Sequence, residues 1–376
     1  MAKIGDVCAS KIDTLSAAYN GKIDYIDISA VDNREKKITQ TAIVLAKDAP
    51  SRAKQLVEHG DVIVSLVRPN LNAVAIIEEQ SQNLQVASTG YCVLRCNQMI
   101  YNRYLFYFCQ SETFVNSMTA QATGASYPAV SNSIVKNCEI PLPERNKQKE
   151  IADILDKVTS LISLRKQQLV KLDELVKARF VEMFGDPKDN HSNLVKIGEI
   201  GDLTSGGTPS RSNSEYFNGS IRWYSAGELN SLYLPDSIEH ISRTALSQSA
   251  AKLFEKGTLM IGMYDTAAFK MGILTEQSSS NQACANLKPT EQYSVIWLYY
   301  LFDIMKPIFL NERQGVRQKN LSLSKIRNFN IPSAPLALQN QFAAFVERVD
   351  QQKQTVQQSL EKLELMKKAL MQEYFG

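Results

Sequence analysis

The chain repeats itself, and the spacing of the repeat limits its possible folds more than any other feature. Ile140-Pro141 precedes Gln148, and a second Ile-Pro pair precedes Gln339, so the two glutamines are 339 − 148 = 191 positions apart. The same offset separates three further pairs: Gly124 and Gly315, Phe184 and Phe375, and Gly185 and Gly376. Self-similarity at a fixed offset indicates one structural unit present twice. We therefore predict two related domains, each followed by a similar helix.

The globular parts of the two repeats match more loosely. Residues 60–66 return as 257–263, and both are short apolar runs opened by a glycine, which is typical of a buried strand after a turn. Residues 3–7 and 23–26 return as 196–200 and 221–224, with an offset that drifts between 193 and 198. The two domains therefore differ by insertions. Between the matching strands the sequences diverge, as loops with two different specificities on one scaffold would.

Each repeat ends in a long amphipathic pattern. Alternate steps of four and three residues from Ile151 and from Phe342 meet mostly apolar side chains, as in a coiled coil. Where one seam carries Arg165 or Lys353, the other carries an apolar residue, so the two helices are predicted to pack on each other. Dimerisation of the chain through these helices is the alternative. The predicted helix–helix seam is Ile151, Leu155, Val158, Ile162, Leu169, Leu172 and Val176 in the first helix and Phe342, Val346, Val349, Val356, Leu360, Leu363 and Leu370 in the second.

These patterns predict an α+β fold with a pseudo-two-fold internal repeat. Two similar mixed α/β globular domains, 1–145 and 186–335, are joined by two long antiparallel coiled-coil helices, 146–185 and 336–376. A helix of about 36 residues is about 54 Å long at 1.5 Å per residue. Such a rod spans more than one turn of a DNA duplex. The expected architecture is a spacer with a binding face at each end.

The sequence lacks the signatures of most enzymes. It contains no Gly-rich phosphate loop, no glycine-rich cofactor turn, no methyltransferase Asn/Asp-Pro-Pro-aromatic motif and no histidine pair at metal-ligand spacing. The chain is therefore predicted to be non-catalytic, and we expect it to bind no cofactor or metal. Cys92 and Cys96 fall on one face of a predicted strand, but core packing is favoured over zinc because no second ligand pair exists.

The cellular location is predicted from patterns that the sequence lacks. The six cysteines form no disulfide framework, which suits a reducing compartment. The N-terminus has no apolar signal core, and no run approaches 18 apolar residues. We expect a cytoplasmic protein with no membrane partner. The net charge of +3 does not itself identify a partner, so a nucleic-acid binder would need locally placed cations.

Polar side chains gather near glycine-containing turns at comparable places in both repeats. Arg, Asn, Ser and Thr read base edges, and Arg or Lys also binds phosphate. These residues are therefore candidates for contact with DNA, and a solvated loop is the alternative for any single one. They are Arg68, Asn70, Asn72, Thr123, Ser126 and Tyr127 in the first repeat and Tyr264, Arg313, Arg317 and Lys319 in the second.

Two motifs carry a resemblance to a known family. Residues 205–210 read Ser-Gly-Gly-Thr-Pro-Ser and are followed at 216–223 by Tyr-Phe-Asn-Gly-Ser-Ile-Arg-Trp. This order resembles the opening of a target recognition domain in the specificity subunits of type I restriction-modification systems. The Ile-Pro junctions before Gln148 and Gln339 resemble that family's join between recognition domain and helix. The likeness adds Thr208, Ser210 and Arg211 to the candidate DNA contacts. Residues 13–20 of the first repeat lack the Gly-Gly-Thr-Pro turn.

The resemblance implies a subunit that reads a bipartite site on double-stranded DNA, one half with each domain. It implies two methyltransferase subunits and restriction subunits as partners, docked in part on the helices. S-adenosylmethionine, ATP and Mg would then belong to those partners, and the complex would methylate adenine. Two alternatives stay open from the residues: a scaffold that assembles partners without binding DNA, and an autonomous nuclease, which the absence of a carboxylate cluster disfavours.

Overall fold

The computed structural model describes residues 1–78, 81–189, 193–313 and 320–376, and it divides into two compact units. Unit 1 contains Met1–Lys166 and Gln358–Gly376, and unit 2 contains Gln167–Gln357. The two long helices are α5 (Arg145–Phe184) and α9 (Leu336–Phe375), and each contributes one part to each unit. The four-part division along the sequence stays a prediction, because contacts in space divide the chain across both helices.

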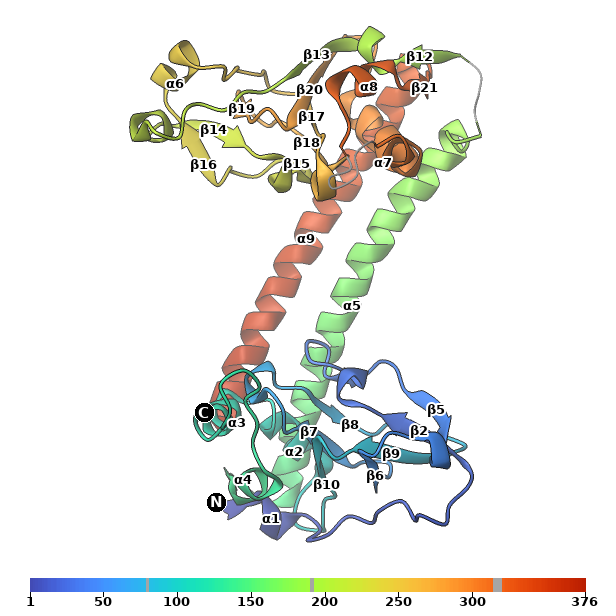
Figure 1. Ribbon diagram of the computed structural model, residues 1–376, viewed down its shortest axis with the longest axis vertical. Coiled ribbons are helices and arrows are strands. Elements are labelled where there is room, and N and C mark those ends of the chain that lie inside the picture. Colours follow the sequence, from blue (N-terminus) through green and yellow to red (C-terminus); the bar gives the residue numbers. More distant parts are fainter. Residues whose placement is uncertain (79–80, 190–192, 314–319) are drawn as a thin grey trace. The chain divides into compact units, whose positions relative to one another are not determined.

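The described residues of unit 1 form four short α-helices, a three-stranded sheet, a four-stranded sheet and two two-stranded pairs, which lie beside the first part of α5. Strands β10, β7 and β8 form an antiparallel sheet, and a mixed sheet has the order β5-β2-β9-β6 (Figure 1). Its elements are β1 (Ala2–Lys3), α1 (Ile4–Val7), β2 (Lys22–Ile26), β3 (Val31–Asp32), β4 (Lys37–Ile38), β5 (Ala42–Leu45), β6 (Ala53–Leu56), β7 (Val62–Ser65), β8 (Val74–Ile76), β9 (Leu84–Ser88), β10 (Tyr91–Leu94), α2 (Asn102–Phe108), α3 (Glu112–Ala120), α4 (Asn132–Asn137) and β11 (Glu139–Ile140).

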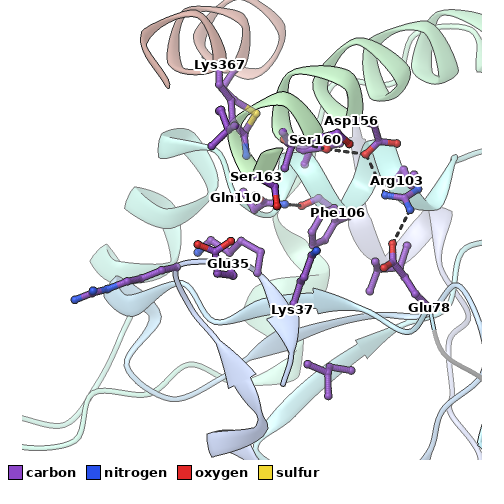
Figure 2. A pocket seen from close by; sticks show the side chains of 18 of the residues that line it. Glu35, Lys37, Glu78, Arg103, Phe106, Gln110, Asp156, Ser160, Ser163 and Lys367 are labelled. Carbon is purple, nitrogen blue, oxygen red and sulfur yellow. Dashed lines mark hydrogen bonds and ion pairs between the residues drawn. The ribbon is translucent and has the colours of Figure 1, made fainter. Parts of the chain in front are cut away.

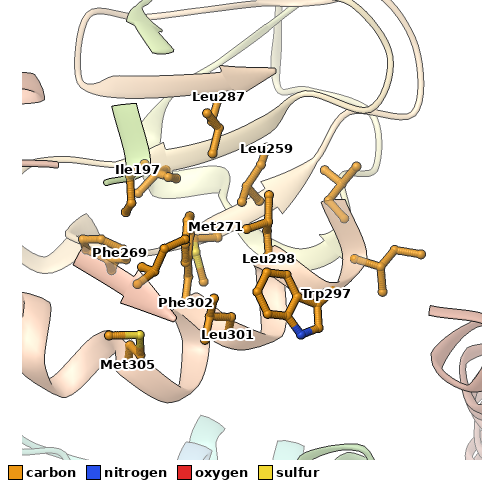
Figure 3. Close-up of a cluster of buried hydrophobic side chains, with 14 of the residues drawn as sticks. Ile197, Leu259, Phe269, Met271, Leu287, Trp297, Leu298, Leu301, Phe302 and Met305 are labelled. Atoms are coloured by element: carbon orange, nitrogen blue, oxygen red, sulfur yellow. The ribbon is translucent and has the colours of Figure 1, made fainter. Parts of the chain in front are cut away.

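Unit 2 has a five-stranded sheet, β13-β20-β17-β18-β15, and a three-stranded sheet, β16-β14-β19. Figure 3 shows the apolar face of α7 against Leu259 and Leu287 of the larger sheet, where Trp297 and Phe302 are fully buried. The elements are β12 (Leu194–Lys196), β13 (Gly201–Ser205), β14 (Ile221–Tyr224), β15 (Asn230–Tyr233), β16 (Glu239–Ile241), α6 (Arg243–Gln248), β17 (Leu259–Gly262), β18 (Met271–Ile273), β19 (Ser279–Ser280), β20 (Cys284–Pro289), α7 (Val295–Asn311), α8 (Leu323–Asn328) and β21 (Asn330–Pro332).

Within each unit the parts of α5 and α9 run antiparallel. In unit 2 the ring centroids of Phe180 and Phe342 are 5.2 Å apart, and Lys353 Nζ lies 2.6 Å from Asp173 Oδ1. The numbering therefore falls along one helix as it rises along the other. In unit 1 Phe375 of α9 packs in the same apolar cluster as Ile151 of α5. The mixed α/β fold with two long helices, predicted from the repeat, is confirmed.

The seam residues lie on the inner faces of these helix parts, buried or half-buried. The alternating steps of four and three residues from Ile151 do not include Phe180. Its side chain is nevertheless fully buried against Trp297 and Phe342. Leu161 and Met366, two apolar residues beside the predicted seam, are 45% and 52% exposed. The buried stripe near the end of α5 advances in steps of four, because the helix there packs on a domain as well as on α9.

The first and last strands of each domain pair with each other. Ala2 of β1 is opposite Ile140 of β11, and Val195 of β12 is opposite Ile331 of β21. The Ile-Pro junctions found in the sequence are therefore the closing strands of the two domains. Each domain ends where it began, immediately before its long helix. Among the described residues, no helix combines the length and the apolar character needed to cross a bilayer.

Candidate nucleic-acid interface

Two loops of unit 1 come together at one end of strand β7. Val67 and Thr123 both form bridges with Ala129, and the Val130 N–H donates to the Leu66 carbonyl at 2.9 Å. This pairing joins the loop after β7 to the loop before α4. The six candidates of the first repeat all lie on these two loops: Arg68, Asn70, Asn72, Thr123, Ser126 and Tyr127.

The first of these loops has an unusual backbone. Arg68 and Asn72 flank the turn Pro69–Leu71 and have φ of 48° and 47°. For residues with a side chain this left-handed conformation costs roughly 1–2 kcal/mol each. The Arg68 N–H donates to the Pro128 carbonyl at 2.7 Å, and the Lys36 amino group donates to the Asn72 carbonyl. Strained residues held by surrounding bonds are typical of functional loops.

Except for Asn72, which is half-buried with its Oδ1 enclosed, the candidate side chains of this loop pair point to solvent. The Arg68 guanidinium lies 5.2 Å from the centroid of the Tyr127 ring, which is 52% exposed. Asn70, Thr123 and Ser126 are also exposed. An arginine stacked on a tyrosine with neutral polar neighbours presents one cation and several donors and acceptors without a carboxylate between them. Such a surface is suited to a nucleic-acid groove.

Unit 2 has a similar backbone contact at the end of β17. The Leu321 N–H donates to the Met263 carbonyl at 2.8 Å, the counterpart of the Val130–Leu66 bond in unit 1. Tyr264 begins this loop and is 39% exposed, and the Asp265 N–H donates to Asn320 Oδ1 at 3.0 Å. Arg313 follows α7, which ends at Asn311, and its Nε–H donates to the Leu310 carbonyl at 2.9 Å. Arg317 and Lys319 lie outside the described residues.

The remaining candidates of unit 2 lie beside the three-stranded sheet. The Thr208 hydroxyl donates to Gln282, and the Ser210 and Ser212 hydroxyls are 2.8 Å apart. The run Gly206-Gly207 lies against other backbone: a Cβ at either glycine would overlap a carbonyl oxygen, that of Ser280 or Ala250. The glycines of the family-like motif are therefore required for close packing.

Arg211 is bound to its own unit. Its guanidinium forms a two-pronged ion pair with Glu239, with Nη2 2.8 Å from Oε2. It also lies 4.5 Å from the centroid of the Phe217 ring and 5.4 Å from that of Trp223. The hydrogen bonds with Arg211 lower the pKa of Glu239 below its ordinary value. These contacts give Arg211 a positioning role in the loop, in addition to any contact with DNA.

Unit 1 also has a large cleft, of about 1160 Å³, which the sequence did not indicate. Figure 2 shows side chains from the β3–β4 turn, α2, α5 and α9 converging on it. Arg103 of α2 lies 2.5 Å from Glu78 Oε1 and 3.0 Å from Asp156 Oδ1 of α5. The Tyr107 hydroxyl donates to the same Asp156 oxygen at 2.7 Å. These bonds join the domain to the helix.

Three lysines line one side of the cleft. Burial, and then repulsion by Lys367, lower the pKa of Lys36 to about 8. Burial and repulsion by Lys166 also lower the pKa of Lys367, which lies 5.8 Å from the centroid of the Tyr107 ring. Lys166 itself pairs with Glu35 at 3.0 Å. The dibasic turn at Lys36 was visible in the sequence, but its convergence with residues of both helices was not.

In the part of the chain that the structure describes, no group of three or more His, Cys, Asp or Glu side chains is arranged to hold a metal ion. Cys92 is fully buried in the apolar cluster of unit 1, and Cys96 packs against it. Burial raises the pKa of Cys92 to about 12, so its thiol stays protonated. The placement of both cysteines fits the core-packing interpretation.

Comparison with known proteins gives one consistent family. Residues 1–174 and 190–365 match the family described as "Type I restriction modification DNA specificity domain". The specificity subunit of EcoR124I/EcoR124II from Escherichia coli is 25% identical over 59% of this chain and 57% of its own length. That of MjaIX from Methanocaldococcus jannaschii is 29% identical over 31% and 27%. These alignments thus span about half, or less, of the curated relatives.

Two solved structures share the fold over the whole chain. One belongs to a study of complex assembly and conformational transition in the type I R-M system, with a TM-score of 0.65 and 24% identity over 100% of this chain and 96% of that one. The other is the S subunit of the type I restriction-modification system of M. genitalium, with a TM-score of 0.61 and 15% identity over 100% and 95%. At such identities the likeness concerns the fold.

Proposed function

Because the chain belongs to the type I restriction modification DNA specificity family, we propose that it selects the DNA sequence on which a type I restriction-modification complex acts. The observation that carries this proposal is a backbone contact repeated in both units. The Val130–Leu66 bond in unit 1 and the Leu321–Met263 bond in unit 2 join equivalent positions beside equivalent strands. Two readers with different side chains on one frame suit a site with two unlike halves.

The chain would contribute binding and no chemistry of its own. The curated relatives are named as specificity subunits of type I restriction enzymes, and by analogy the proposed partners are two methyltransferase subunits and restriction subunits. S-adenosylmethionine, ATP and Mg would be held by those partners, and the assembly would work in the cytoplasm. Each good bidentate base contact discriminates by about 1–3 kcal/mol. Two linked readers gain affinity because the second binds at a raised effective concentration.

The test is selection of bound duplexes from a randomised DNA pool by the purified full chain together with its methyltransferase. The proposal predicts enrichment of two short blocks separated by a spacer of fixed length and free sequence. A pool that stays random would favour the scaffold alternative, and one continuous block would contradict the two-reader arrangement. Cleavage of DNA by the chain alone with Mg would revive the nuclease alternative.

Loop variants assign each half-site to its domain. Arg68→Ala should relax one block and flatten the salt dependence of binding, because a cation is lost. Tyr264→Ala should relax the other block only. Lys22→Ala, which removes an exposed lysine of β2 outside the loop pair, is the matched control for charge. If both loop variants relaxed the same block, the assignment of one half-site to each domain would be wrong.

The helices are proposed to set the spacer length. Each has 40 residues, which corresponds to about 60 Å of helix. Removing one heptad from each helix preserves the apolar seam and shortens both by about 10 Å, or about three base-pair steps. The selected spacer should then become shorter. An unchanged spacer would show that the helices do not measure it.

A further inference from the structure

Two cysteines of unit 1 face each other across a short antiparallel bridge. Cys8 follows helix α1 and Cys96 follows strand β10, and the two are bridge partners. On either side of them the Ala9 N–H donates to the Arg95 carbonyl at 2.8 Å, and the Asn97 N–H donates to the Val7 carbonyl at 3.0 Å. Cys8 and Cys96 thus form the non-hydrogen-bonded pair between two flanking bonds.

This position brings the two side chains close. In a non-hydrogen-bonded antiparallel pair the Cα atoms are about 4.5 Å apart and the side chains lie on the same face. That separation falls within the range of about 4.4–6.8 Å over which disulfides span. The sulfurs therefore need no movement of the backbone to meet.

The surrounding contacts fix both partners. The Arg95 guanidinium donates to both carboxylate oxygens of Asp61, at 3.0 and 2.8 Å, and Asn97 Nδ2 donates to the Asp6 carbonyl at 3.1 Å. The neighbours of Cys96 are thereby tied to the sheet and to α1. The pairing of Cys8 with Cys96 is held by side chains as well as by the two backbone bonds.

The two thiols differ in access. Cys8 is 6% exposed and belongs to the apolar cluster that also contains Cys92 and Cys109, whereas Cys96 is partly exposed at its edge. A hydrogen bond with Cys96, followed by burial, raises the pKa of the Cys8 thiol. Because Cys96 is the more exposed thiol, an oxidant can reach it first. The buried Cys8 is then the resolving thiol, which reacts with oxidised Cys96. A shared zinc ion is not supported, since no group of three metal-binding side chains occurs among the described residues.

We propose that Cys8 and Cys96 are an oxidation site that closes to a disulfide when a peroxide reaches unit 1. The Cys96 thiolate attacks one oxygen of hydrogen peroxide and becomes a sulfenic acid, and hydroxide leaves and takes a proton to form water. The Cys8 sulfur then attacks the Cys96 sulfur. Its proton and the sulfenic hydroxyl leave as a second water, and the S–S bond forms. A small-molecule thiol reverses the change by exchange.

The disulfide would tie the start of the chain to the sheet that carries the unit 1 reading loop. It closes a loop of 96 − 8 = 88 positions, which restricts the unfolded chain. Helix α1 also contacts α4, and the Lys136 amino group of α4 donates to the carbonyls of Ala9 and Ser10. Oxidation would thus fasten the segment on which α4 rests.

The test uses the full chain treated with hydrogen peroxide, quenched and denatured, with free thiols counted by maleimide labelling. The count should fall from six to four, the intact mass should drop by two hydrogen atoms, and a peptide map should link Cys8 to Cys96. Dithiothreitol should restore all six. The variant Cys96→Ser should keep its five remaining thiols under the same treatment.

Cys138→Ser is the matched control, because Cys138 is also partly exposed at the edge of the same cluster. It should still lose two thiols. Six reactive thiols after peroxide would overturn the proposal. So would a gain of oxygen atoms in place of the loss of hydrogen, or a link between any other pair of cysteines. None of these results depends on whether the chain binds DNA.

Discussion

Gln148 and Gln339 hold the same junction in their separate units. The Gln148 side-chain oxygen accepts from the Tyr101 N–H at 2.8 Å, and the Gln339 oxygen accepts from the Ser294 N–H at 2.8 Å. Tyr101 and Ser294 precede the first residues of α2 and α7. Each glutamine also donates to the carbonyl five residues before it, at 2.8 and 2.7 Å. In each unit one buried amide thus connects the long helix, the segment that follows the closing strand and the start of the domain helix.

Replacing either glutamine should loosen its own unit. Gln148→Ala leaves the part-buried Tyr101 N–H without its partner, at a cost of about 1–3 kcal/mol. Hydrogen exchange of the Tyr101 amide should accelerate, while that of the Ser294 amide stays unchanged. Gln339→Ala should give the reverse pattern. Gln341→Ala, at an exposed position of α9, is the control, and acceleration at both amides in either variant would contradict the assignment.

Phe180 should be among the most costly positions of α5 to truncate. Its ring is fully buried and lies 6.3 Å from Trp297 and 5.2 Å from Phe342, centroid to centroid. Phe180→Ala should lower the free energy of unfolding by about 3–5 kcal/mol in urea titrations. Leu164→Ala, at a side chain 58% exposed on the same helix, should change it by less than about 0.5 kcal/mol. Equal effects would mean that Phe180 does not anchor unit 2.

Arg211 should stabilise its loop in a pH-dependent way. The ion pair keeps Glu239 ionised and lowers its pKa, so its contribution is present above the unfolded pKa near 4.5 and is lost as pH falls through the folded value. Arg211→Ala should lower the thermal midpoint at pH 7, by an amount that corresponds to about 1 kcal/mol. The difference from the parent should shrink at lower pH. A double variant with Glu239→Ala should be no less stable than Arg211→Ala alone.

Lys36 should make unit 1 more stable at alkaline pH. Because its pKa falls from 10.5 to about 8 on folding, the unfolded chain binds more protons between these values. The free energy of unfolding should therefore rise with pH from about 8 to 10.5, by up to about 3 kcal/mol. Lys36→Met should remove this rise in urea titrations across that window. Lys37→Met, at the exposed neighbouring position, should keep it.

The repeat allowed much of the fold to be predicted, because a constant offset and a heptad-like pattern are properties of the sequence itself. The alternating pattern did not predict that Phe180, near the end of α5, is buried. Phe180 packs on Trp297 of α7, which lies more than a hundred positions away in the sequence. The loops carrying Arg68 and Tyr127 were both singled out, but their meeting at Ala129 required the structure. Sequence alone also gave no sign that Arg211 is paired with Glu239.

The way the units are assembled has a consequence for synthesis of the chain. Unit 2 is one continuous stretch, Gln167–Gln357, whereas unit 1 needs Gln358–Gly376 in addition to the first 166 residues. On the ribosome, the later domain can therefore complete its core while the earlier one still lacks the Phe375 ring that packs 5.1 Å from Tyr104. Unit 1, which is synthesised first, is therefore the last to complete its core. A nascent chain released early would carry a complete second unit and an incomplete first one.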